Sequence, residues 1–291
     1  MTTLSIRKAL KEAQRTLSRA GIDTARLDAE ILLAYVLEKG RIYLHLEPDA
    51  LLTNQQQSQF DGLIRRRENY EPVAYILGEQ EFWSLKFRVN KHTLIPRPDT
   101  ETMIEKVLKD YPDTAAPLRM ADFGTGSGCI IIALLSEYQK ATGQAIDQSA
   151  KAIETAVSNA KQNAVMDRAE FQAISWFDAA LNDFIRLPLD ILVSNAPYIP
   201  ANDIKDLDAD VRDYEPHSAL DGGVDGLDDV RHIVSLAPSL LKEGGRLYLE
   251  IGFQQADDTA NIMAEAGLRH IEKTKDIAGI ERIVSGQLLK N

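Results

Sequence analysis

The residues best suited to chemistry follow a short apolar run. Leu189–Ser194 is rich in branched residues, which predicts a buried parallel strand. Directly after it stand an amide, a small residue, a proline and an aromatic ring: Asn195, Ala196, Pro197 and Tyr198. Because open α/β sheets bind ligands at the carboxyl ends of their strands, we expect the reaction to take place here.

A glycine-rich loop joins an earlier predicted strand, Arg119–Phe123, to an apolar helix that begins at Cys129. Its glycines let the backbone turn tightly and approach a ligand without an intervening Cβ. The spacing differs from the G-x-G-x-x-G fingerprint, so a dinucleotide is not the first choice. Five consecutive residues form the candidate binding loop: Gly124, Thr125, Gly126, Ser127 and Gly128.

An acidic residue follows at the end of the next predicted strand. Asp147 lies nineteen positions after Gly128, where a carboxylate can accept hydrogen bonds from both hydroxyls of a ribose. An adenosine-type nucleoside site is therefore expected, the alternative being a turn with a helix-capping Asp. Trp176 follows the third predicted strand and is a candidate for lining the adenine pocket, although core packing explains it nearly as well.

The stretch from Asn195 to Tyr198 is suited to methyl transfer from S-adenosylmethionine to an amide nitrogen or a conjugated amino nitrogen. The lone pair of such a nitrogen is delocalised, which makes it a poor nucleophile. The side-chain oxygen of Asn195 and the backbone carbonyl of Ala196 can each accept one N–H, turning the lone pair toward the methyl group. Tyr198 would pack on the planar acceptor. This displacement needs no strong base, and the stretch offers none.

The charge and composition of the chain limit the classes of partner that it can bind. The chain has 291 residues, a net charge of -11 and a pI near 5.0, so it lacks the basic field that attracts a phosphate backbone. We expect a protein or small-molecule substrate and no direct nucleic-acid binding. The single cysteine, Cys129, predicts a reducing compartment and no metal site. Without a signal peptide or a run of membrane-spanning length, the expected location is the cytoplasm.

The elements that position these residues divide into two regions. From Ser5 to Asn69 the apolar spacing is helical, and a helix over 54–69 ends in Arg65, Arg66 and Arg67. We interpret this triplet as a solvated helix end, with a docking patch as the alternative. From Leu118 onward, strands alternate with helices, which predicts a mainly parallel sheet covered on both faces.

A hairpin is predicted between the regions. Alternating aromatic and branched residues in 82–89 indicate two short strands. Arg97 follows between two prolines that hold it in extended backbone, which suits the wall of a cleft. An ordinary domain linker is the alternative.

These motifs together closely resemble the protein-(glutamine-N5) methyltransferases that modify peptide chain release factors. The resemblance covers nearly the whole chain and is carried by seven segments: 71–78, 94–101, 122–128, 194–198, 219–223, 225–227 and 249–252. It implies a Rossmann-like α/β methyltransferase domain (99–291), an N-terminal helical bundle that docks the release factor (1–78) and a β-hairpin linker (79–98). The implied cofactor is S-adenosylmethionine, and the implied acceptor is the glutamine of the Gly-Gly-Gln loop.

The resemblance also assigns site residues. The cofactor site would comprise Gly124 to Gly128, Asp147, Trp176 and Asn195. The glutamine would be held, and its nitrogen methylated, beside Asn195, Ala196, Pro197 and Tyr198. Arg97 joins the candidate substrate-binding residues on the separate ground that its two prolines suit it to a cleft wall.

Two positions depart from the family pattern. The usual strand end is Asn-Pro-Pro-Tyr, but here Ala196 takes the second position, and Ser175 replaces a common Asp before Trp176. Alanine keeps the carbonyl acceptor but frees the backbone, at an ordering cost of about 1 kcal/mol. Two alternatives stay open, the first because adenine methyltransferases share an Asn-Pro-Pro-Tyr type of strand end and the second because of Ala196. One is adenine amino-group methylation of nucleic acid, and the other is a cofactor-binding partner module with weakened catalysis.

Overall fold

The computed structural model describes residues 4–289, which form two compact units. The first comprises the chain up to Gly78 together with Asp208–Tyr214, and the second comprises Glu79–Leu207 and the chain from Glu215 onward. The range expected for the methyltransferase domain, 99–291, includes residues 208–214. In the structure this segment belongs to the first unit, because its contacts are mainly with the helices of that unit.

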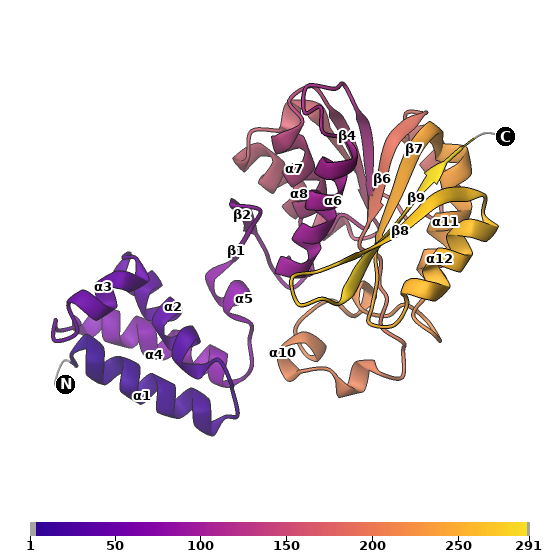
Figure 1. The fold of residues 1–291 in the computed structure, drawn as a ribbon. Helices are drawn as coiled ribbons and strands as arrows, with labels where there is room; N and C mark the ends of the chain where they lie inside the picture. Colours follow the sequence, from indigo (N-terminus) through magenta and orange to yellow (C-terminus); the bar gives the residue numbers. More distant parts are fainter. Residues whose placement is uncertain (1–3, 290–291) are drawn as a thin grey trace. The chain divides into compact units, whose positions relative to one another are not determined.

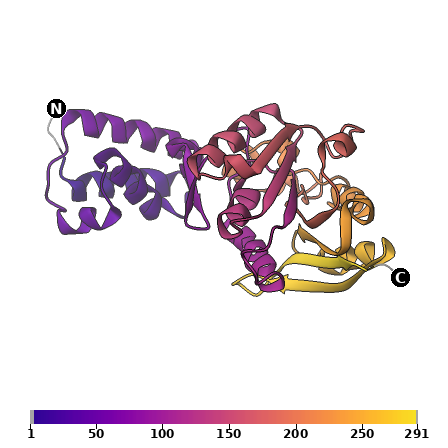
Figure 2. The ribbon, with the colours of Figure 1, turned by 90° about the horizontal axis from the view of Figure 1, so that it is seen from above.

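The first unit is a helical bundle (Figure 2). Apolar side chains spaced along the helices fill its core, among them Leu17, Leu32 and Phe60, all nearly inaccessible. The longest helix begins with a capping box, in which the Thr53 side chain accepts from the backbone of Gln56 and the Gln56 side chain accepts from the backbone of Thr53. The helices are α1 (Ile6–Arg19), α2 (Ala25–Leu37), α3 (Arg41–Leu46), α4 (Asn54–Glu68) and α5 (Val73–Leu77).

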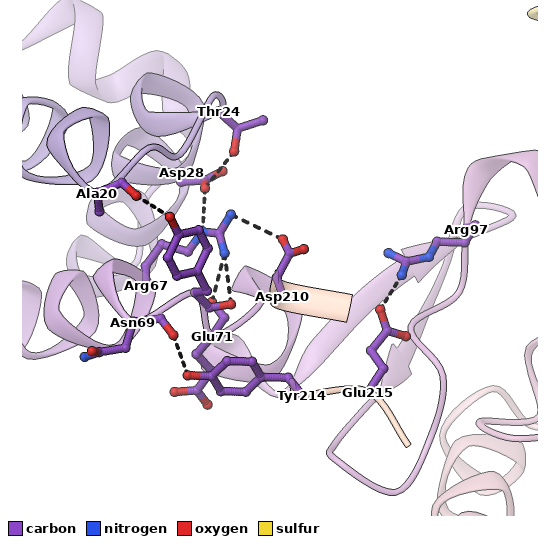
Figure 3. A network of polar contacts seen from close by, with 11 residues as sticks. Ala20, Thr24, Asp28, Arg67, Asn69, Glu71, Arg97, Asp210, Tyr214 and Glu215 are labelled. Carbon is purple, nitrogen blue, oxygen red and sulfur yellow. Dashed lines mark hydrogen bonds and ion pairs between the residues drawn. The ribbon is translucent and has the colours of Figure 1, made fainter. Parts of the chain in front are cut away.

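A buried arginine holds the 208–214 segment to this bundle (Figure 3). Arg67 Nε donates to Asp28 Oδ2 at 2.7 Å, and its Nη2 lies 3.5 Å from Asp210 Oδ2. Nearby, the Tyr214 hydroxyl donates to the carbonyl of Asn69 at 2.6 Å. The interpretation of the arginine triplet as a solvated helix end was therefore wrong for Arg67, which is buried and paired with two carboxylates.

The second unit is built on a twisted sheet of seven strands within residues 4–289 (Figure 1). Their spatial order is β5, β4, β3, β6, β7, β9, β8, with parallel pairing from β5 to β7 and antiparallel pairing of β9 to both its neighbours. The strands are β3 (Arg119–Phe123), β4 (Thr142–Asp147), β5 (Ala169–Ala173), β6 (Leu189–Ser194), β7 (Leu241–Glu250), β8 (Leu268–Lys275) and β9 (Glu281–Leu288).

Helices cover both faces of this sheet, as the alternation of strand and helix predicted (Figure 1). Because side chains alternate along a strand, Val193 packs on the α6 and α7 side while Leu192 packs on the α11 and α12 side. The helices are α6 (Glu101–Asp110), α7 (Cys129–Glu137), α8 (Ala150–Gln162), α9 (Leu181–Phe184), α11 (Asp228–Leu240) and α12 (Ala256–Glu265). The predicted α/β fold class is confirmed.

Shorter elements complete the chain. The predicted hairpin consists of β1 (Glu79–Phe82) and β2 (Leu85–Arg88), whose Phe82 and Phe87 rings pack edge to face in the core of the second unit. Within the 208–214 segment lies α10 (Ala209–Arg212). The 3₁₀ turns are η1 (Pro98–Thr100), η2 (Met166–Arg168), η3 (Ile204–Asp206) and η4 (His217–Ala219). No helix within residues 4–289 combines the length and apolarity needed to cross a membrane.

Candidate functional site

The candidate site is a cavity of about 220 Å³ in the second unit. The strand order reverses between β3 and β6, and parallel sheets leave a crevice beyond the carboxyl ends at such a point. Nine of the twelve candidate site residues line this cavity: Arg97, Gly124, Thr125, Gly126, Ser127, Asp147, Trp176, Asn195 and Pro197. Three others, Gly128, Ala196 and Tyr198, are not among its lining residues.

The glycine loop between β3 and α7 shapes one side of the cavity. Gly126 has a φ of +55°, and a Cβ added there would meet no atom within 4 Å. A Cβ on Gly128 would instead meet Ile132 at 2.8 Å, so Gly128 serves the packing of α7. The Thr125 hydroxyl braces the loop by donating to Asp122 at 2.7 Å. Burial raises the pKa of Asp122 to about 7.

Asp147 ends β4 and faces the cavity beside this loop. Its Oδ2 accepts from the Gly126 amide at 2.9 Å, and its Oδ1 accepts from the Ser149 amide at 2.8 Å. Burial raises the pKa of Asp147, and the two amides act in the opposite direction. Since two carboxylate oxygens offer about four lone-pair positions, the side chain keeps acceptor capacity for a ligand hydroxyl.

Trp176 forms another part of the wall, and α11 fixes its orientation. The indole Nε1 donates to Asp229 Oδ1 at 3.2 Å, and His232 Nε2 lies 3.1 Å from the Trp176 carbonyl oxygen. A Cβ on Gly124 would meet the indole ring at 3.2 Å, so the loop glycine and the ring are fitted to each other. Ser175 does not line the cavity, and its hydroxyl accepts from the Phe177 amide. Neither Asp229 nor His232 was singled out in the sequence.

The end of β6 delivers Asn195 to the cavity. Ser194 is fully buried, and its hydroxyl donates to the Phe123 carbonyl at 2.6 Å, which ties the ends of β6 and β3 together. Asn195 is half-buried, whereas Ala196 is 2% exposed and packs in the core. Burial, with a contribution from the charge of Glu250, raises the pKa of Tyr198 to about 12. Tyr198 is therefore neutral at physiological pH.

A glutamine missed in the sequence fixes the backbone beyond this strand end. Gln255 Nε2 donates to the Tyr198 carbonyl at 2.9 Å, and Gln255 Oε1 accepts from the Gly252 amide at 2.8 Å. Its position at the start of α12 gives no sequence signal. The 219–227 stretch packs against the same backbone, and a Cβ on Gly222 would meet the Pro197 carbonyl oxygen at 2.7 Å.

Replacing Gly226 by alanine is expected to disturb this backbone. Gly226 has a φ of +75°, where a non-glycine residue costs about 1–2 kcal/mol, and its added Cβ would lie 2.2 Å from the Tyr198 carbonyl oxygen. Gly267→Ala is the matched control, because Gly267 has a φ of +89° but open space around the added atom. Unfolding in urea should show an additional loss of about 1–3 kcal/mol for Gly226→Ala over the control. Equal losses would contradict a close contact between Gly226 and the Tyr198 carbonyl.

Arg97 also lines the cavity and lies just before η1 and α6 in the chain. It is paired with Glu215, a side chain that is almost fully buried (Figure 3). Glu215 Oε2 also accepts from the Ile95 amide at 3.0 Å. The arginine that the two prolines hold in extended backbone thus borders the cavity with a fixed carboxylate partner.

Comparison with known proteins agrees with this architecture. Residues 8–78 match the family model described as the PrmC N-terminal domain, and residues 116–282 match a methyltransferase domain. The hMettl16 catalytic domain, solved in complex with an RNA hairpin, is 15% identical and aligns with a TM-score of 0.61, covering 77% of this chain and 84% of that chain. At this identity the likeness concerns the fold alone.

Curated relatives match over nearly their full length. The release factor glutamine methyltransferase of Bradyrhizobium diazoefficiens is 41% identical, covering 96% of this chain and 95% of the relative. The enzyme of the same name from Vibrio cholerae is 42% identical, covering 98% and 97% respectively. The chain therefore belongs to the family of release factor glutamine methyltransferases.

Proposed function

We propose that this protein methylates the side-chain amide nitrogen, N5, of the glutamine in the Gly-Gly-Gln motif of peptide chain release factors. The observation that carries the proposal is the placement of Asn195 beside the glycine loop and Asp147, in a chain of which 96% matches a release factor glutamine methyltransferase. The family uses S-adenosylmethionine, which supplies an electrophilic methyl group when bound.

The residues around the cavity fit this cofactor. Gly126 leaves open space where a side chain would stand, and Asp147 keeps acceptor capacity suited to the ribose hydroxyls. The Trp176 ring offers an apolar surface for adenine. We assign these three positions, with Gly124, Thr125 and Ser127, to the cofactor, and we assign Gly128 to packing beneath the loop.

The residues at the end of β6 then act on the acceptor. The Asn195 side-chain oxygen accepts one N–H of the glutamine amide, and the carbonyl of Ala196 accepts the other. These bonds orient the nitrogen lone pair and stabilise the positive charge that grows on the amide. Tyr198 stays neutral and packs on the amide plane, while Pro197 and Arg97 line the cavity.

The parts of the chain have separate roles in this proposal. We assign residues 1–78 to docking of the release factor, 79–98 to the linker between domains and 99–291 to methyl transfer, with 208–214 joining the docking unit. Release factors work in the cytoplasm, so the proposal places the reaction there. The net charge of -11 supports a protein partner over direct binding to nucleic acid.

A labelling experiment tests the proposal. Purified protein is incubated with methyl-labelled cofactor and an intact release factor, beside a release factor whose Gly-Gly-Gln glutamine is replaced by alanine. Label should enter the first and not the second. Equal labelling of both, or of neither while the cofactor binds, would refute the assignment. Addition of DNA and RNA oligonucleotides as acceptors tests the adenine alternative in the same assay.

Replacing Ala196 by proline is expected to raise turnover by up to about fivefold. Proline at position 196 restricts the backbone of Asn195 to extended conformations. The strand end then loses less conformational entropy when the substrate binds, a saving of about 1 kcal/mol. Steady-state kinetics on the release factor measures the effect, with calorimetric titration of the cofactor as the control. If neither form turns over while both bind cofactor, the chain acts as a cofactor-binding partner module instead.

A further inference from the structure

Glu250 is a buried carboxylate at the same edge of the sheet as the candidate site. It is the last residue of β7 and only 2% exposed. Ser194 of β6 pairs with Leu249 of β7, so Asn195 and Glu250 are the next residues along two parallel neighbouring strands. One carboxylate oxygen, Oε2, has no hydrogen-bond partner within residues 4–289. A buried polar group of this kind calls for an explanation.

Several elements surround this carboxylate with polar and charged groups. Burial raises the pKa of Glu250 to about 7, while the Thr100 hydroxyl, the Arg282 charge and the Asn195 side chain lower it. The charge of Asp99 raises the pKa of Glu250 further. The charge of Glu250 in turn raises the pKa of the Tyr198 hydroxyl and of the Cys129 thiol. Arg282 does not neutralise Glu250 alone, because its guanidinium also lies 3.2 Å from Asp276 and 3.7 Å from Asp99.

The chemistry of the pair dictates which end of the Asn195 amide faces the carboxylate. An ionised carboxylate has lone pairs but no proton, so it accepts a bond only from the amide nitrogen. With Nδ2 turned to Glu250, Oδ1 is the end left for the cavity. A protonated carboxyl can also donate to Oδ1, which permits the reversed amide.

We propose that Glu250 is a positioning residue that fixes the Asn195 amide with Nδ2 toward the carboxylate and Oδ1 toward the acceptor nitrogen. The proposal rests on the proposed function, because Oδ1 matters only if it receives an N–H of the acceptor. Glu250 itself does not contact the substrate. It acts through Asn195, which lines the cavity.

The proposal predicts a specific pH dependence. Above about pH 7 the carboxylate is ionised and holds the productive amide, and below it the proton is bound and the reversed amide is populated. The kcat for methyl transfer should therefore fall as the pH drops through neutrality. Cofactor affinity should change little, because the glycine loop and Asp147 are not rearranged.

The experiment compares Glu250→Gln and Glu250→Asp with Glu243→Gln, the same change at an exposed position of β7. The kcat on an intact release factor is measured from about pH 5.5 to about pH 8.5, with calorimetric cofactor titration on each sample. Glu250→Gln should lower kcat about tenfold at high pH and abolish the acid limb of the profile. Glu250→Asp should keep an acid limb, and Glu243→Gln should match wild type.

The outcomes separate the two proposals. If wild type labels no release factor at any pH, the proposed function fails. If wild type is active but shows no acid limb near neutrality, the role of Glu250 is overturned even without a variant. The role is equally overturned if Glu250→Gln binds cofactor and keeps the wild-type profile. Titration of the release factor itself is common to all samples and cancels in the comparison.

Discussion

Replacing Asn195 by alanine is expected to lower kcat for release-factor methylation by about a hundredfold to a thousandfold. The change removes the side-chain oxygen that orients the acceptor nitrogen and stabilises its developing charge, and loss of one such preorganised group costs this much in other enzymes. Ser194 should still tie β6 to β3, so the fold and the cavity persist. Single-turnover labelling of the Gly-Gly-Gln glutamine measures the effect directly.

The matched control is Asn202→Ala, an exposed asparagine a few residues farther along the chain. It should retain wild-type kcat. Cofactor affinity of Asn195→Ala, measured by calorimetry, should fall by no more than about tenfold, because the glycine loop, Asp147 and Trp176 remain. A kcat within about threefold of wild type would remove Asn195 from the mechanism.

Arg67→Ala is expected to destabilise the helical unit by about 3–5 kcal/mol. The substitution leaves the Asp28 carboxylate buried without its cation, and removing one partner of a buried pair typically costs this amount. It also removes the bonds from Arg67 to the carbonyls of Tyr70 and Glu71. Urea unfolding followed by far-ultraviolet circular dichroism should show the helical signal lost at a lower urea concentration.

Two further variants sharpen this test. Arg65→Ala, on the same helix but exposed, should change stability by less than about 0.5 kcal/mol. Combining Arg67→Met with Asp28→Asn should recover part of the loss, since both charges then leave the interior. If Arg67→Ala unfolds at the wild-type urea concentration, the buried pair contributes nothing to the unit.

The sequence predicted the sheet because its signals are local. Branched runs such as Leu189–Ser194 and the glycines of 122–128 carry their meaning within a few residues, and the alternation of strand and helix follows from them. Alternation of aromatic and branched residues likewise predicted the β1 and β2 hairpin. The sequence also selected nine residues that the fold brings to one cavity, because strand ends converge at a switch point.

What the sequence did not reveal depends on distant partners. Arg67 looks like an ordinary helix-end cation until Asp210, 143 positions away, is placed beside it. Gln255 and Asp229 belong to unremarkable helix starts, and their roles appear only when the Tyr198 carbonyl and the Trp176 indole lie next to them. The burial of Glu250 follows from the strand order, which no local pattern specifies.

The membership of residues 208–214 in the helical unit has a consequence for protein engineering. A chimera that exchanges only the first 78 residues between relatives would separate Arg67 from its Asp210 partner and Asn69 from Tyr214. The unit that can be exchanged is discontinuous in sequence, because it comprises the first 78 residues together with residues 208–214. Among family members that differ in partner preference, we therefore expect positions in the first 78 residues to covary with positions in 208–214.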